Sequence, residues 1–185
     1  MQSIDADNPI RKWFAGLVEA SFQAQIGLCD PPLLDYLAEL LTEFIHVERI
    51  HSLADGTGRR VEDVAAMLFQ LEVAGESGSP TEVRMREMHR HIGDYTLFWT
   101  GVYPEALGSS GPNSKHDRFV DYCTQGKRAY YIASTIPTAH EDVESEVLER
   151  LSQEFELCAF GLNEARKEWE RRDPPGPGNL VVFKS

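Results

Sequence analysis

Apolar residues recur at helical spacing in six segments of the chain. In an amphipathic helix they stand at i, i+3, i+4 and i+7. The first segment shows this stripe at Ile10, Trp13, Phe14, Leu17 and Val18. No segment alternates apolar and polar residues as a half-buried strand does. The pattern predicts an all-α fold, a single-domain bundle of about six helices over residues 1–172.

Turn and capping residues predict the helix boundaries. Asn8-Pro9 is expected to start the first helix and Gly27 to end it. Asp30-Pro31-Pro32 starts the second, which runs to about Leu53. Further helices are expected over about 60–74, 79–101, 114–135 and 139–171. The last is expected to be continuous and roughly 45–50 Å long, with a charged end at 164–172 that projects or serves a partner.

We expect the helix that begins at Ser79 to be the centre of the fold. Ser79, Pro80 and Glu82 form a helix-start signal. One face of this helix carries Met88, His91, Ile92, Tyr95, Phe98, Trp99 and Val102. Gly93 lies in mid-helix at a cost of about 1 kcal/mol, so either a neighbouring helix approaches closely or the helix bends there. The predicted core comprises Trp13, Leu37, Phe44, Tyr95, Phe98, Trp99, Phe119, Leu151 and Phe155.

Three stretches carry a resemblance to other proteins. They read H-I-G-D-Y-x-L-F-W-x-G-x-Y-P-E at 91–105, D-Y-C-x-Q-G-K-R-A-Y-Y at 121–131 and L-S-x-E-F-E-L-C-x-x-G-L at 151–162. Together they resemble a family of uncharacterised all-helical bacterial proteins, over most of the chain after residue 10. The resemblance implies an all-α fold and brings no activity, cofactor or catalytic residue.

Charge and composition exclude several classes of partner. The formal net charge is -12, from 18 basic and 30 acidic side chains. Such an acidic chain repels phosphate backbones and anionic membrane surfaces, so we expect no nucleic-acid or membrane partner. No apolar run approaches the roughly 18–20 residues of a spanning helix, and residues 1–12 lack the pattern of a secretory signal. We therefore expect a cytoplasmic protein.

The three cysteines do not suggest a disulfide framework or a zinc site. Cys29, Cys123 and Cys158 are odd in number and far apart. Cys123 and Cys158 lie on inner helix faces, which favours packing over a role as nucleophile.

A possible metal site is the most specific chemical hypothesis. Glu48-x-x-His51 has the spacing by which ferritin-like di-iron bundles bind metal on one helix face. The central helix offers Glu87, His91 and Asp94 instead of a second such pair, because Arg90 follows Glu87 by three positions. Because the second pair is missing, we favour the alternative that His51 and His91 are histidines at the edge of the core, hydrogen-bonded to acidic or tyrosyl neighbours. No cofactor other than this metal is expected.

Aromatic residues suggest a second kind of site. Tyr95, Trp99, Tyr122 and Tyr130 either line a small-molecule pocket or belong to an ordinary helical core.

The leading interpretation is a non-enzymatic helical domain that acts through protein–protein contact or self-association. It rests on the incomplete catalytic patterns, the long last helix and the C-terminal segment. That segment consists of a linker, DPPGPG at 173–178, and a short apolar tail, NLVVFKS at 179–185. The alternative is a bundle that binds a metal or a small ligand.

Overall fold

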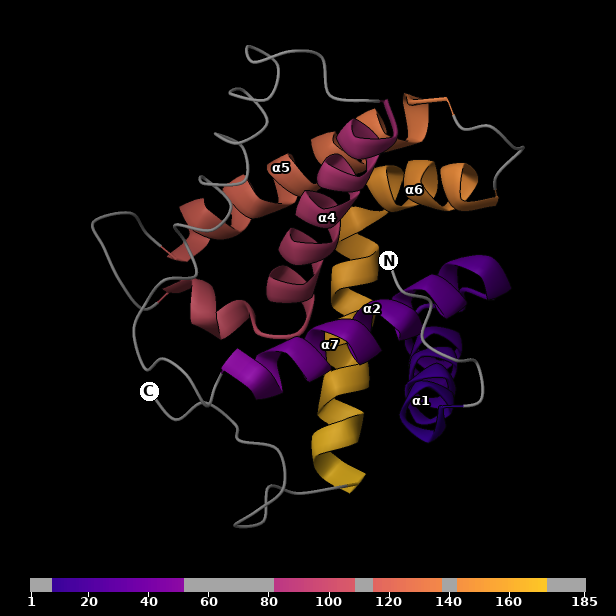
Figure 1. Ribbon diagram of the computed structural model, residues 1–185. Coiled ribbons are helices and arrows are strands. Elements are labelled where there is room, and N and C mark those ends of the chain that lie inside the picture. Colours follow the sequence, from indigo (N-terminus) through magenta and orange to yellow (C-terminus); the bar gives the residue numbers. More distant parts are fainter. Residues whose placement is uncertain (1–7, 52–81, 109–114, 138–142, 173–185) are drawn as a thin grey trace. The chain divides into compact units, whose positions relative to one another are not determined.

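The computed structural model describes residues 8–51, 82–108, 115–137 and 143–172 (Figure 1). Within these ranges the side chains of 45–51, 108, 115–119 and 143 are not described. The elements are α1 (Pro9–Gln25), α2 (Pro31–His51), α4 (Glu82–Gly101), η1 (Pro104–Gly108), α5 (Lys115–Thr135), α6 (Val143–Gln153) and α7 (Phe155–Arg172). No strand occurs in these ranges. The predicted all-α bundle of about six helices is confirmed.

The predicted helix over 60–74 and the tail over 173–185 lie outside the described residues. Contacts divide the chain into two compact units. Unit 1 comprises 1–56 and 160–185, and unit 2 comprises 57–159, so the boundary falls within α7. The expectation that residues 1–172 form one domain stays a prediction.

Local capping chemistry sets both ends of α1 in unit 1. The side chain of Asn8 accepts a hydrogen bond from the N–H of Ile10 at 2.9 Å, and Pro9 occupies the first turn. Gly27 has a φ of 73°, a left-handed conformation that ends a helix at little cost for glycine. Its N–H donates to the carbonyl of Phe22 at 2.9 Å. The boundaries predicted for this helix are confirmed.

Aromatic residues join the elements of unit 1. α1 packs against α2. The ring of Phe22 lies on Gly161 of α7, where a Cβ would come within 2.2 Å of a ring carbon. The ring centroids of Phe14 and Trp169 are 5.4 Å apart. The buried apolar residues of this unit are Phe14, Leu17, Val18, Phe22, Leu33, Leu34, Leu37, Ala38, Leu40, Leu41, Leu162, Ala165 and Trp169.

The prediction that Trp13 lies in the core is wrong, because this residue is 37% exposed, whereas its neighbour Phe14 is 2% exposed. The charged end of α7 does not project from unit 1. Ala165 and Trp169 are buried there, and Trp169 packs on the aromatic residues of α1. That this end serves a partner stays a prediction.

The central position predicted for α4 is confirmed within unit 2. Every residue from Ile92 to Val102 is buried. α4 packs against α5, α5 packs against α6, and η1 contacts both α4 and α5 (Figure 1). Of the predicted core, Leu37, Tyr95, Phe98, Trp99, Leu151 and Phe155 are buried, Phe44 is half-buried and the side chain of Phe119 lies outside the described residues.

Glycines let the helices of unit 2 approach closely. A Cβ on Gly93 of α4 would lie 2.6 Å from carbons of the Tyr130 ring on α5. A Cβ on Gly126 of α5 would lie 2.4 Å from both Phe155 and Thr96. The close approach considered for Gly93 is therefore confirmed, and it gives a packing reason for a glycine in mid-helix.

The prediction of one continuous helix over 139–171 is wrong. The chain bends at Glu154, which separates α6 from α7. Helical hydrogen bonds continue on both sides, from the N–H of Glu154 to the carbonyl of Arg150 and from the N–H of Cys158 to the carbonyl of Glu154. No proline or glycine stands at the bend. It adjoins Phe155, which is fully buried against α5, so tertiary packing accounts for it.

Candidate functional site

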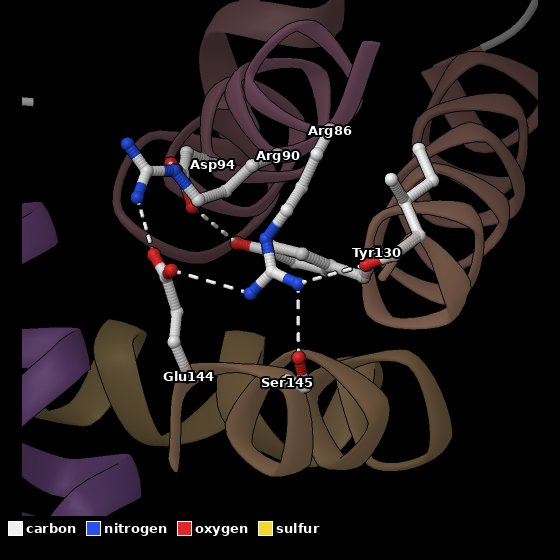
Figure 2. A network of polar contacts seen from close by, with 7 residues as sticks. Arg86, Arg90, Asp94, Tyr130, Glu144 and Ser145 are labelled. Carbon is white, nitrogen blue, oxygen red and sulfur yellow. Dashed lines mark hydrogen bonds and ion pairs between the residues drawn. The ribbon is translucent and has the colours of Figure 1, made fainter. Parts of the chain in front are cut away.

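A network of polar side chains lies among α4, α5 and α6 in unit 2 (Figure 2). Arg86, Arg90 and Asp94 follow one another at intervals of four on α4, so they share one side of that helix. Opposite them lie Tyr130 of α5 and two residues in the first turn of α6, Glu144 and Ser145. The network therefore draws on all three helices.

Arg86 is the most buried cation of this network, with 5% of its surface exposed. Its Nη1 donates to the hydroxyl of Ser145 at 2.9 Å and to the carbonyl of Ile136 at 3.2 Å. Its Nη2 lies 3.3 Å from Oε2 of Glu144. A buried charge is costly unless it is paired, and these contacts supply the pairing. Arg86 thus connects α4 to the end of α5 and the start of α6.

Arg90 and Glu144 complete the ion pairs of the network. Nη1 of Arg90 forms an ion pair with Oε1 of Glu144, and its Nε lies 3.9 Å from Oδ2 of Asp94. Glu144 therefore contacts both arginines, one with each carboxylate oxygen. Two guanidinium groups face two carboxylates. Charge-assisted hydrogen bonds of this kind are stronger than neutral ones.

Tyr130 connects α5 to α4 at two points. Its hydroxyl donates to Oδ1 of Asp94 at 2.8 Å, and its ring covers Gly93, the preceding residue of α4. Asp94 is buried, with 6% of its surface exposed. The hydrogen bond therefore satisfies a carboxylate oxygen that has little access to water.

The environment also shifts nearby titratable groups. Burial, followed by the positive charge of Arg128, lowers the pKa of His89. His91 is at the surface, yet partial desolvation by the surrounding protein, followed by the charge of Arg90, lowers the pKa of its imidazole. Both histidines are therefore more often neutral near pH 6 than free histidine is.

The surroundings of Cys123 disfavour the thiolate form of its side chain. Burial, followed by the negative charge of Glu156, raises its pKa to about 11, against the opposing effect of Lys127. The thiolate is the nucleophilic form of cysteine, so this environment favours the packing role expected for Cys123.

The five predicted metal ligands differ in burial, and two of them have no described side chain. Glu87 and His91 are exposed on α4, whereas Asp94 is buried and accepts a hydrogen bond from Tyr130. The side chains of Glu48 and His51 lie outside the described residues. Among the described residues, no group of three or more His, Cys, Asp and Glu side chains is placed to hold a metal ion. The five-residue site stays a prediction, because its α2 half is not described.

The four predicted pocket residues, Tyr95, Trp99, Tyr122 and Tyr130, are all buried in unit 2. The ring centroids of Tyr95 and Trp99 are 6.1 Å apart, and Trp99 also contacts Phe98 at 5.3 Å. These aromatic contacts are those of a packed helical core. That they line a small-molecule pocket stays a prediction.

The sequence pattern does not identify the network as a unit. It indicates Asp94 and Tyr130 separately and does not indicate Arg86, Arg90 and Ser145. The available signal is the series of charged residues four apart along the edge of the apolar stripe of α4. Their partners come from positions 36 to 59 residues away, which spacing on one helix does not identify.

No protein-family model matches the chain, and neither a curated protein nor a solved structure does so. This is consistent with the resemblance to an uncharacterised all-helical family. No helix in the described ranges is both long enough and apolar enough to cross a membrane.

Proposed function

We propose that this protein is a non-enzymatic domain of the bacterial cytoplasm that acts by associating with itself or with another protein. The outer face of α7 provides the contact. The observation that carries the proposal is the exposure of two large apolar side chains on this helix, Leu157 at 39% and Phe160 at 49%.

These two side chains form a small apolar surface on α7. At 100° per residue they lie about 60° apart on the helix, on the side away from the buried residues Phe155 and Leu162. Residues three apart on a helix are neighbours. Exposed aromatic and aliphatic neighbours favour burial against a partner, and aromatic residues are enriched at protein interfaces.

The buried polar network supports the same proposal. Its two guanidinium groups and two carboxylates balance one another within unit 2, and its hydrogen bonds join three helices. Residues engaged in this way contribute to holding the fold together. That leaves the outer helix faces as the surface on which the domain acts.

The test is the mass of the full chain in solution. Sedimentation velocity over about 1–100 µM detects dissociation constants of that order. We expect wild type to sediment above the 20.9 kDa of one chain and L157S/F160S to sediment as a single chain. The matched control is V83S, because Val83 is exposed on α4 and should not take part.

If the partner is a different protein, tagged wild type and V83S retain it from a cell extract and L157S/F160S does not. The proposal is contradicted if wild type sediments as a single chain and also retains the same proteins from the extract as L157S/F160S does.

A further inference from the structure

The first turns of α1 present a second apolar surface, which we call the α1 patch. It consists of Ile10 and Trp13, each 37% exposed and three positions apart. The Trp13 ring packs edge-on against Phe14 at 5.0 Å and against Trp169 of α7 at 5.9 Å. These contacts hold the indole in place while more than a third of the residue remains at the surface.

The α1 patch is small, and a segment already tethered beside α1 and α7 can cover it without a larger interface. Taking about 250 Å² for a tryptophan side chain, the exposed part of Trp13 amounts to roughly 90 Å². A specific interface buries about 800 Å² on each partner. A segment tethered to the same chain needs far less area, because a short linker holds it at an effective concentration of about millimolar.

The part of the sequence that follows α7 contains a segment suited to the patch. α7 ends at Arg172, three residues after Trp169, and Trp169 contacts Trp13. The linker 173–178 follows, and a six-residue extended linker of this composition spans about 19 Å. Four consecutive apolar residues come next, at 180–183. Trp13, Trp169 and Arg172 all belong to unit 1.

We propose that residues 180–183 dock on the α1 patch of the same chain. Leu180 and Phe183 are the largest apolar side chains of the segment, and their burial on Ile10 and Trp13 removes apolar surface from water on both sides. The inference does not depend on the outer face of α7, so it can fail while the proposed association holds.

Acrylamide quenching of tryptophan fluorescence in the full chain tests the proposal. Trp99 is 2% and Trp169 is 5% exposed, so Trp13 dominates the accessible emission. We expect L180S/F183S to raise the quenching constant about twofold, because an amphipathic indole loses its cover. K184S is the matched control in the same segment and should leave quenching unchanged. The difference should be the same at about 1 and 50 µM protein, since a tethered contact is independent of concentration.

Two results overturn the proposal. Equal quenching in wild type and in L180S/F183S shows that the segment does not cover Trp13. A difference that grows with protein concentration shows that the patch is covered by a second copy. Hydrogen exchange of residues 179–185 provides an independent check, because I10S should accelerate it if the patch is the docking site, and unchanged exchange contradicts this.

Discussion

The ring of Tyr130 lies over Gly93, so close that a Cβ on this glycine would be 2.6 Å from two of the ring carbons. The hydroxyl of the same tyrosine donates to Asp94, the next residue of α4, at 2.8 Å. One side chain of α5 is therefore held by two consecutive residues of α4. The ring sets the distance between the two helices, and the hydrogen bond sets their register.

The first prediction is that G93A destabilises the protein by about 1–2 kcal/mol in urea denaturation. Tyr130 is fully buried, so its ring has no room to move away from the added methyl group. Overpacking of this kind costs about 1–3 kcal/mol, and the gain in helix propensity returns up to about 1 kcal/mol.

G16A is the matched control for this variant. Gly16 is also inside a helix, but a Cβ there meets nothing within 4 Å. We expect G16A to stabilise the protein by up to about 1 kcal/mol. Equal effects of G93A and G16A would contradict the close approach of Tyr130.

The second prediction concerns Arg86. R86M should lower the free energy of unfolding by roughly 2–4 kcal/mol, because Glu144, Ser145 and the carbonyl of Ile136 lose a charged donor. R84M is the control, since Arg84 is exposed on the same helix and should change the stability by less than about 0.5 kcal/mol. Similar losses of unfolding free energy in R86M and R84M would show that the contacts of Arg86 do not hold α4 to its neighbours.

The third prediction is a dependence of stability on pH that involves His89. Its pKa is lowered in the folded protein, so the unfolded chain takes up the proton first as the pH falls below about 6.5. The stability present above that pH is then lost as the pH falls towards the pKa of the folded state. Thermal unfolding from pH 7 to 5 should show a smaller loss for H89Q than for wild type. An equal loss of thermal stability in H89Q and wild type between pH 7 and 5 would show that His89 does not cause this dependence.

The fourth prediction concerns the three thiols. Cys29 is exposed, whereas Cys123 and Cys158 are buried. With a pKa of about 11, roughly one Cys123 in a thousand is a thiolate at pH 8. Titration of the native protein with a thiol reagent should show one fast group, and C29S should remove it. Three fast groups in native wild type would contradict the burial of Cys123 and Cys158.

Parts of the fold follow from local chemistry and were predictable from the sequence. Asn8 caps α1 through its own side chain, and Gly27 takes the left-handed conformation that ends it. Each acts on backbone groups a few residues away, so the sequence around it contains the whole signal.

Other parts depend on contacts between distant residues. The bend at Glu154 has no proline or glycine, and it adjoins Phe155, whose ring packs on Gly126 of α5. Trp13 and Phe14 both fit the apolar stripe of α1. Which of them lies deeper depends on their packing with α7, where both rings meet Trp169.

The candidate site was predictable only in part for the same reason. Spacing on α4 identified Asp94 as a polar residue beside the apolar stripe that needs a partner. It pointed to a histidine or a metal ion as that partner, whereas the structure supplies the hydroxyl of Tyr130, 36 positions away. The partner is determined by how α4 packs on α5.

The buried polar residues of α4 stabilise the packing of the helices of unit 2. A double-mutant cycle between Tyr130 and Asp94 tests this most directly. Urea denaturation of Y130F, D94A and the double variant should give a coupling free energy of about 1–2 kcal/mol. The same cycle with Y131F should give none, because Tyr131 is exposed on α5. A coupling below about 0.3 kcal/mol between Tyr130 and Asp94 would contradict the claim.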